Sequence, residues 1–305
     1  MLHLDHIKSV AHSVGFDLCG VAPCRVFAED SRFLESWLER GYGSGLDYLS
    51  RNGDKRCDCT KLVEGAASVI VCGVAYKNSF SSGYSAECQQ KIASYALTTD
   101  YHTTIKQMLR DMCAALKQHY PTLSGRCFSD SAPVFEKRYA VEAGLGWIGR
   151  QSLLITPTFG SFVLLGVAII NAPCDHYDSP YTANGCHNCH RCVEACPNNA
   201  IIERHIDTRR CISCATVEGR TTTPLHGWIF GCDICSSVCP YNAAAPAATN
   251  SAFAPTFNPV EVDWNKMSEA EFNSHFAHTP LSRTSLEALK QRVAQNITYC
   301  RESNS

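Results

Sequence analysis

Two runs of cysteine between residues 186 and 240 constrain this chain more than any other feature of its sequence. The first run follows Cys-x2-Cys-x2-Cys-x3-Cys-Pro, and the second repeats that pattern with its first spacing stretched. This is the spacing of bacterial-type iron–sulfur sites. The two runs contain Cys186, Cys189, Cys192, Cys196, Cys211, Cys232, Cys235 and Cys239. Eight thiolates can supply four ligands to each of two [4Fe–4S] clusters.

The same spacing predicts how these ligands are divided. Three cysteines two residues apart wrap one cluster, whereas the cysteine before proline points to the other. One cluster is expected on Cys186, Cys189, Cys192 and Cys239, and the other on Cys196, Cys211, Cys232 and Cys235. Zinc and disulfides are the alternatives. Paired Cys-x2-Cys elements suit zinc, but a triple run that twice ends in Cys-Pro favours the clusters. Clusters with crossed ligands should lie close enough to exchange an electron.

Length and composition favour an ordinary globular protein. The 305 residues suggest about two domains, and 45% of them are hydrophobic. No apolar run reaches the ~18 residues that cross a bilayer, and the N-terminus has neither a signal-like region nor a twin-arginine pair. We therefore expect a cytoplasmic protein without a membrane partner. Its 19 cysteines, an odd number, fit metal ligands and reduced thiols rather than a disulfide framework.

Apolar periodicity predicts the elements. Helical spacing occurs over residues 6–14 and 33–40, and apolar runs typical of strands cover 16–22, 69–75 and 162–170. The glycines at 41, 43 and 45 begin a segment read as flexible, and Asp100 is a candidate N-cap for a helix. Alternating strands and helices predict an α/β or α+β domain over 1–175. A ferredoxin-like domain should cover 176–245, and 246–305 should form a linker and a helical tail.

One glycine-rich stretch, residues 144–149, has the spacing of a dinucleotide fingerprint. It follows a helix-like stretch rather than a strand, so the context that such a fingerprint requires is missing. A tight turn is the simpler interpretation, and close approach of the backbone to a bulky ligand is the functional one.

Six further segments follow one another along nearly the whole chain. They are Asp-Lys-Arg at 54–56, a stretch from 95 that ends in Asp-Tyr-His at 102, Asp-Ser-Ala-Pro-Val at 130–134, Ala-Gly-Leu-Gly-Trp-Ile-Gly-Arg at 143–150, Arg-Cys-Ile-Ser at 210–213 and the last cysteine run to 242. Together, in this order, they resemble the cobalamin-dependent epoxyqueuosine reductase family. The resemblance implies a cobalamin-binding domain related to that of reductive dehalogenases, joined to a two-cluster ferredoxin-like domain. It also implies reduction of the epoxide of epoxyqueuosine, at the wobble position of tRNA, to the alkene of queuosine.

The resemblance assigns Asp130 as the acid that protonates the leaving oxygen, beside the cobalamin. An ordinary aspartate, with a pKa near 3.9, is ionised at neutral pH. We expect bound cobalamin and substrate to raise the pKa of Asp130 by desolvation. From the residues alone, a helix cap at Asp130 or Ser131, before Pro133, would be the preferred reading.

Other roles are implied by position. The residues expected to contact cobalamin are Arg56, Ala93, Gln151, Leu154, Leu165, Ser213, Asp233 and Ile234. Ordinary core packing explains Leu154 and Leu165 equally well. Arg220 is the candidate contact to a tRNA phosphate, although the arginines around Cys211 alone would favour a solvated loop. The chain departs from the family at His187 and His190, which should face solvent, at Cys214, interpreted as a thiol that is not a ligand, and at Gln151, which replaces Asn or Asp.

The expected partners are tRNA bearing epoxyqueuosine in its anticodon loop and an unidentified low-potential electron donor, with the chain as a monomer. With a charge of −2, the composition gives no general signature of nucleic-acid binding. Two alternatives stand beside the reductase. One is a dehalogenase-like corrinoid enzyme that acts on a small molecule. The other is a plain electron-transfer protein, which would not need 175 residues before its clusters.

Overall fold

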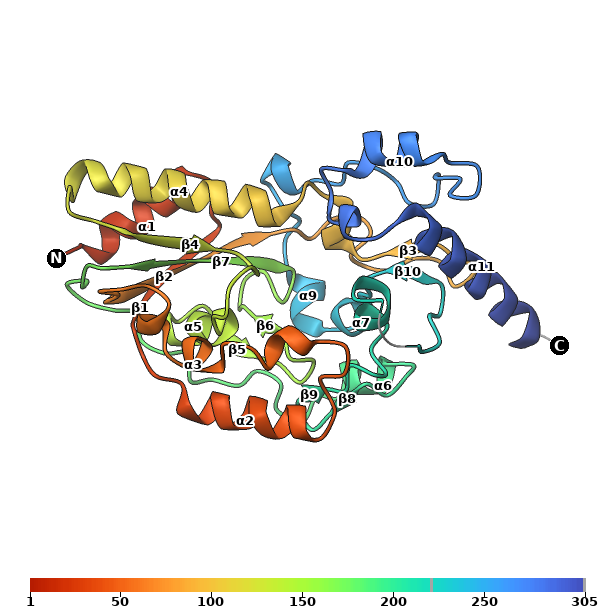
Figure 1. The fold of residues 1–305 in the computed structure, drawn as a ribbon, viewed down its shortest axis with the longest axis horizontal. Coiled ribbons are helices and arrows are strands. Elements are labelled where there is room, and N and C mark those ends of the chain that lie inside the picture. Colours follow the sequence, from red (N-terminus) through yellow and green to blue (C-terminus); the bar gives the residue numbers. More distant parts are fainter. Residues whose placement is uncertain (220–221, 304–305) are drawn as a thin grey trace.

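A four-stranded antiparallel sheet forms the centre of the N-terminal part (Figure 1). The computed structural model describes residues 1–219 and 222–303. The strands lie in the order β1 (Leu18–Pro23), β2 (Ser68–Ala75), β7 (Val163–Ile170) and β4 (Gly125–Phe128). The strands predicted at 16–22, 69–75 and 162–170 are confirmed, and their antiparallel pairing makes α+β the better of the two predicted terms.

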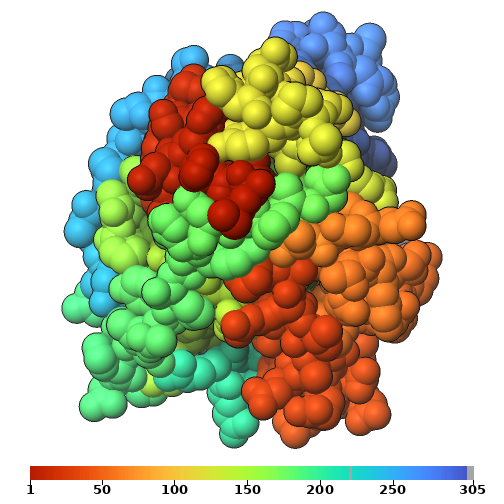
Figure 2. All heavy atoms as spheres, turned by 90° about the vertical axis from the view of Figure 1, so that its left-hand side faces the viewer, coloured from red at the N-terminus to blue at the C-terminus, as the bar shows by residue number. Residues whose placement is uncertain are grey.

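The two faces of this sheet are covered by different helices. In β2 and β7, Ile70 and Ala168 face α1 (Leu4–Ser13) and α4 (Tyr101–His119), whereas Val71 and Val167 face α5 (Glu136–Glu142). Successive side chains of a strand point to opposite faces, so covering both faces requires a continuous apolar run. Figure 1 shows the sheet between these helices, and Figure 2 shows α1 beside α4 at the N-terminal end.

One predicted helix begins earlier than its sequence pattern indicated, and a segment predicted to be flexible contains short helices. The helix predicted at 33–40 is α2 (Ala28–Glu39). The segment read as flexible contains η1 (Asp47–Leu49) and α3 (Gly53–Cys57), and η2 (Cys59–Lys61) follows it. Its fold is held by Arg56, whose buried guanidinium donates hydrogen bonds to the carbonyl oxygens of Tyr48, Leu49 and Arg51.

The glycine-rich stretch lies in a turn and a tight hairpin. Gly144 ends α5 with φ +73°, and β5 (Trp147–Ile148) pairs with β6 (Leu154–Ile155). A Cβ at Gly146 would lie 2.1 Å from the carbonyl oxygen of Ile155, so the hairpin requires glycine there. The simpler interpretation, a tight turn, is confirmed.

The cysteine-rich part consists of short elements joined by loops. These are α6 (Arg191–Ala195), β8 (Ile201–Ile202), β9 (His205–Ile206), α7 (Ile212–Val217), β10 (Trp228–Phe230), α8 (Ile234–Ser237) and α9 (Pro240–Ala244). Helices α6 and α8, one from each cysteine run, pack together. Strand β10 pairs in parallel with β3 (Lys91–Ile92), which precedes η3 (Ser94–Leu97).

The C-terminal tail is helical, as predicted. It contains η4 (Ser251–Phe253), α10 (Glu269–Phe276), η5 (Pro280–Arg283) and α11 (Leu286–Ser303). Leu286, Leu289 and Val293 are buried in one core with Ile92 and Phe230, so the tail packs on the β3–β10 ribbon. The domain limits at 175 and 245 stay a prediction. Within the described residues, no helix combines the length and apolar character needed to span a bilayer.

Candidate iron–sulfur and proton-transfer site

Four thiols from the two cysteine runs form one neighbouring set. The pKa of the Cys192 thiol is raised by burial and by the nearby thiols of Cys186, Cys239 and Cys189. Burial and the thiols of Cys186 and Cys189 likewise raise the pKa of Cys239. Cys239 comes from the second run, so the set has the members of the predicted crossed set, and its role as one cluster's ligands stays a prediction.

The remaining four thiols form the second set. Burial and the thiols of Cys211, Cys192 and Cys196 are among the causes that raise the pKa of Cys235. The pKa of Cys232 is raised by burial, by Cys235 and by Cys211. The Cys192 thiol also acts on Cys235, so the two sets are neighbours. In number and chemistry the eight thiols match the ligands of two [4Fe–4S] clusters, although no three such side chains in the described part of the chain already converge as a metal site. Binding iron would release their protons, since thiolates are the ligands, and the ligand assignment stays a prediction.

Backbone N–H groups point at the sulfurs of the second set. The N–H of Ala200 donates to the Sγ of Cys196 at 3.3 Å. The backbone N–H groups of Ser213 and Cys214 lower the pKa of the Cys211 thiol, although burial raises it overall. Hydrogen bonds to sulfur are one means of setting a cluster's potential. His187 and His190 are exposed, which confirms that they face solvent.

Asp130 lies at the centre of a cluster of polar side chains. The Tyr101 hydroxyl donates to Oδ2 of Asp130 at 2.9 Å, and Nε2 of His102 lies 3.7 Å from the same oxygen. The Asp130 N–H donates to Oε1 of Glu136 at 2.9 Å. The alternative role, a helix cap, is not formed, because α5 begins at Glu136 after Phe135 and has no side-chain cap.

The proton in this cluster rests on His102. Burial lowers the pKa of His102, but bonds to Asp100 and Asp130 outweigh it and raise that pKa to about 9. Nδ1 of His102 lies 2.7 Å from Oδ1 of Asp100, which also caps α4 as predicted. Burial acts to raise the pKa of Asp130, yet His102, Tyr101 and the charge of Arg283 hold it below its usual value. Because the Asp130 side chain is 67% exposed, burial has little weight, and Asp130 is a carboxylate at neutral pH.

A second carboxyl group next to Asp130 titrates differently. Burial and the charge of Asp130 raise the pKa of Glu136 to about 8. Two adjacent carboxyl groups with pKa values pushed apart are a frequent sign of acid–base chemistry. Asp130 is thus flanked by two groups, His102 and Glu136, that carry protons near neutral pH.

Sequence reasoning assigned no role to Tyr101, His102 or Arg283. Tyr101 and His102 belong to the Asp-Tyr-His segment, and that segment was the signal available for them. Arg283 comes from η5 of the tail, and its charge lowers the pKa of Asp130. The same charge acts against burial at Tyr95, where burial is stronger and raises the pKa. No local pattern around Arg283 marks it.

The predicted cobalamin contacts fall into two groups. Ala93 and Ile234 pack in one apolar cluster with Cys232, and buried Asp233 accepts hydrogen bonds from the N–H and hydroxyl of Ser94, both at 2.6 Å. Ser213 follows Cys211 at the start of α7.

The second group lies near the Asp130 loop. Leu154 and Leu165 pack on the core that contains Phe128, and the Ser129 hydroxyl donates to the carbonyl oxygen of Leu165 at 2.8 Å. Gln151 is 3% exposed. The Arg56 guanidinium donates to backbone carbonyl oxygens of its own segment. These cobalamin assignments stay predictions, and Arg220 lies outside the described residues.

Unpartnered donors test whether this region suits a large polar ligand. In the part of the chain that the structure describes, Trp147 Nε1, Arg150 Nε and Gln151 Nε2 are buried without a hydrogen-bond partner. Leaving a buried donor unpaired costs about 1–3 kcal/mol. A corrinoid, whose rim carries amide groups, could supply acceptors there, so these residues fit the group.

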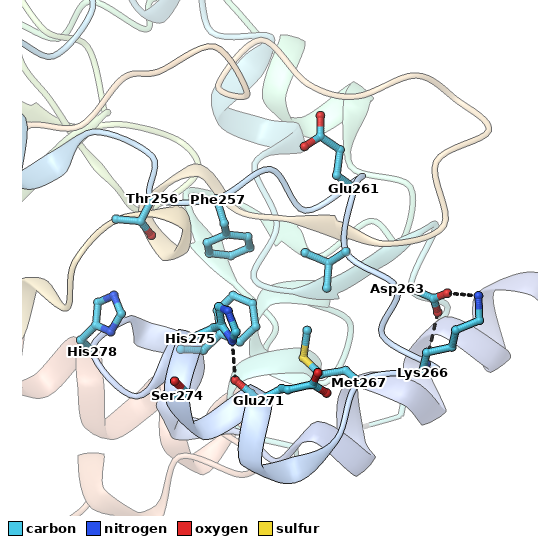
Figure 3. A pocket seen from close by; sticks show the side chains of 12 residues that line it. Thr256, Phe257, Glu261, Asp263, Lys266, Met267, Glu271, Ser274, His275 and His278 are labelled. Carbon is cyan, nitrogen blue, oxygen red and sulfur yellow. Dashed lines mark hydrogen bonds and ion pairs between the residues drawn. The ribbon is translucent and has the colours of Figure 1, made fainter.

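A cavity of about 600 Å³ lies elsewhere, within the tail (Figure 3). Its wall combines Phe257, Met267 and Phe276 with charged side chains such as Glu261 and Lys266. Of the predicted site residues that the structure describes, none lines it. The cavity is therefore separate from the predicted site around Asp130.

Comparisons with known proteins agree with this arrangement. A family model described as "Epoxyqueuosine reductase QueG, DUF1730" matches residues 56–131, and a "4Fe-4S double cluster binding domain" matches 185–242. The epoxyqueuosine reductase of Cyclobacterium marinum is 38% identical over 298 residues, which is 95% of this chain and 96% of that protein. That of Leadbetterella byssophila is 37% identical over 295 residues, 94% of this chain and 96% of that protein.

Solved structures show the same fold. The crystal structure of a selenomethionine-labelled epoxyqueuosine reductase matches with a TM-score of 0.84 at 22% identity, over 96% of this chain and 80% of that one. A structure of epoxyqueuosine reductase with a tRNA-Tyr epoxyqueuosine-modified tRNA stem loop gives the same TM-score, identity and coverage. The predicted fold, an α+β domain joined to a two-cluster domain, is confirmed.

Proposed function

We propose, since the chain belongs to the epoxyqueuosine reductase family, that it reduces the epoxide of epoxyqueuosine in tRNA to the alkene of queuosine. The observation that carries the proposal is the gathering of buried, neighbouring thiols from two cysteine runs on the same polypeptide as Asp130, a carboxylate that accepts a hydrogen bond from Tyr101. Relatives of nearly equal length match over the whole chain, so the activity is proposed for this chain as it stands.

The eight cysteines hold the two clusters, and the two groups of residues around Ala93 and Gln151 are proposed to hold cobalamin. When bound, cobalamin and the clusters supply low-potential electrons to the epoxide carbons. Ser94 and Asp233 fasten the second cysteine run to the N-terminal part, so they would hold the two halves of the proposed cofactor site together.

The chain's own residues supply protons. Converting an epoxide to an alkene consumes two electrons and two protons and releases water, and the departing oxygen is a poor leaving group unless it is protonated. We assign Asp130 as the group that delivers the proton to this oxygen, through Oδ2. In the free protein that proton resides on His102, 3.7 Å away. Bound ligands would exclude water and favour its transfer to Asp130.

Partners are part of the same proposal. A relative's solved structure holds an epoxyqueuosine-modified tRNA stem loop, so we propose the anticodon arm of tRNA as the substrate of this chain. A single-stranded base in such a loop can be splayed out into a protein site. A monomer in the cytoplasm that receives electrons from a low-potential donor, with Arg220 on a phosphate, completes the proposal.

The test uses protein reconstituted anaerobically with iron, sulfide and cobalamin. Given tRNA that bears epoxyqueuosine and a strong reductant, it should yield queuosine, detected as a nucleoside lighter by one oxygen atom. A halogenated aromatic compound, offered in parallel, tests the dehalogenase alternative. Protein that contains about eight irons and a corrinoid, yet leaves the tRNA unchanged, would contradict the proposal.

A further inference from the structure

Two thiols outside the cluster sets lie side by side where α4 meets β4. The Sγ atoms of Cys113, on α4, and Cys127, on β4, are 3.9 Å apart, and both side chains are partly exposed. A disulfide requires a separation of about 2.05 Å. The pair is therefore a dithiol whose sulfurs need to approach by roughly 2 Å to form a bond.

Both thiols open onto a positively charged cavity. Its volume is about 520 Å³, and its wall consists of Arg110, Cys113, Ala114, Lys117, Leu123, Ser124, Gly125, Arg126, Cys127, Phe128 and Ile170. The wall has three cations and no carboxylate. Among residues 1–219 and 222–303, no carboxylate forms an ion pair with Arg110 or Lys117. A concave surface with uncompensated positive charge concentrates anions.

The two thiols are not equivalent. The neighbouring Cys113 thiol and the charge of Arg110 lower the pKa of Cys127, against the effect of burial. The interaction with Cys127 and burial raise the pKa of Cys113. The thiolate is the nucleophile in disulfide exchange, so Cys127 is suited to attack and Cys113 to resolve.

We propose that this cavity is a thiol–disulfide exchange site for a small anionic disulfide, of the class of carboxylate-bearing peptide disulfides. The Cys127 thiolate attacks one sulfur of the disulfide, forms a mixed disulfide and releases one small thiolate. Cys113, losing its proton, then attacks Cys127 and releases the second. The pair is oxidised by two electrons, and the small disulfide is reduced to two thiols.

The position of the pair gives this exchange a consequence. Cys127 stands three residues before Asp130, and Cys113 lies on the helix that begins with Tyr101 and His102. A Cys113–Cys127 bond would therefore join the two elements that bring Asp130 to its proton donors. The exchange itself does not depend on the proposed reductase activity.

The experiment treats the reduced holoenzyme, without oxygen, with glutathione disulfide, and maps the thiols by peptide mass spectrometry. A peptide linked through Cys113 and Cys127 should form. Cys113→Ser should retain one glutathionyl group on Cys127, whereas Cys127→Ser should form neither product. The buried pair Cys19 and Cys72 serves as the internal control and should stay reduced.

The role of the cationic wall is tested with a second disulfide. Arg110→Gln should slow the reaction with glutathione disulfide about three- to tenfold, and it should not slow the reaction with cationic cystamine. If Cys113 and Cys127 stay free while the partly exposed Cys300 reacts, the site does not exist. If Arg110→Gln slowed the reactions with glutathione disulfide and with cystamine equally, the preference for an anionic disulfide would be contradicted.

Discussion

Asp130 owes its position to its own backbone. Its φ of +48° is a left-handed value that Asp and Asn tolerate better than other side chains. This conformation turns the carboxylate toward Tyr101 and His102 and directs the N–H to Glu136. The backbone thus leaves the sheet pattern two residues after the edge strand β4, and a local departure of this kind is common at functional sites.

Asp130→Asn should leave the fold intact, because Asn also adopts a left-handed φ, and should remove the transferable proton. We expect turnover to fall by about 10²- to 10⁴-fold, the usual contribution of general acid catalysis. Iron content and the corrinoid spectrum should match those of the unchanged protein. Single-turnover conversion of epoxyqueuosine tRNA measures the effect, and a rate near the original would remove Asp130 from the assigned role.

His102 should make stability depend on pH. Its pKa is about 9 in the folded protein and near 6.5 when unfolded, so its contribution is complete below pH 6.5 and is lost as pH rises through 9. Across this window the free energy of unfolding should fall by on the order of 3 kcal/mol. Urea denaturation at both ends of the window measures this fall. In His102→Gln it should be smaller, and parallel behaviour of the two proteins would contradict the charge assigned to His102.

For single residues, the sequence was informative where chemistry depends on spacing. The cysteine ligand sets could be predicted from motif spacing, and the role of Asp130 from its position in a family motif. The bond from Tyr101 to Asp130 spans 29 residues, and Arg283 arrives from the tail, so no local pattern could reveal either. The expected rise of the Asp130 pKa concerns the ligand-bound enzyme and stays a prediction; without ligands the pKa is lowered.

Among the elements, the central strands were predictable and their pairing was not. An apolar run such as β2 shows that both faces are covered, but it does not distinguish parallel from antiparallel neighbours. The β3–β10 ribbon could not be foreseen, since β3 has two residues and its partner lies more than 130 positions later. Close approach at Gly231 makes that pairing possible: its φ is +66°, and a Cβ there would lie 2.5 Å from the Cβ of Ala93.

Gly231→Ala should therefore destabilise the ribbon. Left-handed strain and the clash with Ala93 together should lower the free energy of unfolding by about 1–3 kcal/mol. The matched control is Gly53→Ala in α3, where a Cβ would meet nothing within 4 Å and φ is not positive. The control should be neutral or stabilising by up to about 1 kcal/mol. Equal effects of the two substitutions in denaturant titrations would show that the contact is not needed.

For the whole molecule, the crossed ligand sets make the two cysteine runs dependent on each other. Cys239 neighbours the thiols of the first run, while Cys196 neighbours Cys211 and Cys235 of the second, as the predicted crossed ligand sets require. The helices α6 and α8, one from each run, lie in contact. The Cys-Pro spacing is what predicts this crossing from the sequence, and the ligand sets themselves stay a prediction.

Cys239→Ala should lower iron from about eight per chain to about four or fewer, and it should lower the melting temperature of the whole protein. Cys214→Ala is the control, because it alters a buried cysteine of the same region and leaves all eight predicted ligands. Iron analysis of anaerobically prepared protein and thermal unfolding measure both effects. Full iron content in Cys239→Ala would overturn the ligand assignment.

The pairing of β3 with β10 also sets an order of events during protein synthesis. Lys91 and Ile92 find their partner strand, and Ser94 finds Asp233, after the ribosome has made more than 130 further residues. Strand β3 of the nascent chain therefore stays unpaired until the segment that contains β10 has been synthesised. Folding of the N-terminal part thus depends on synthesis of the cysteine-rich segment. We therefore expect protein made without iron to be degraded by proteases faster than protein that contains iron.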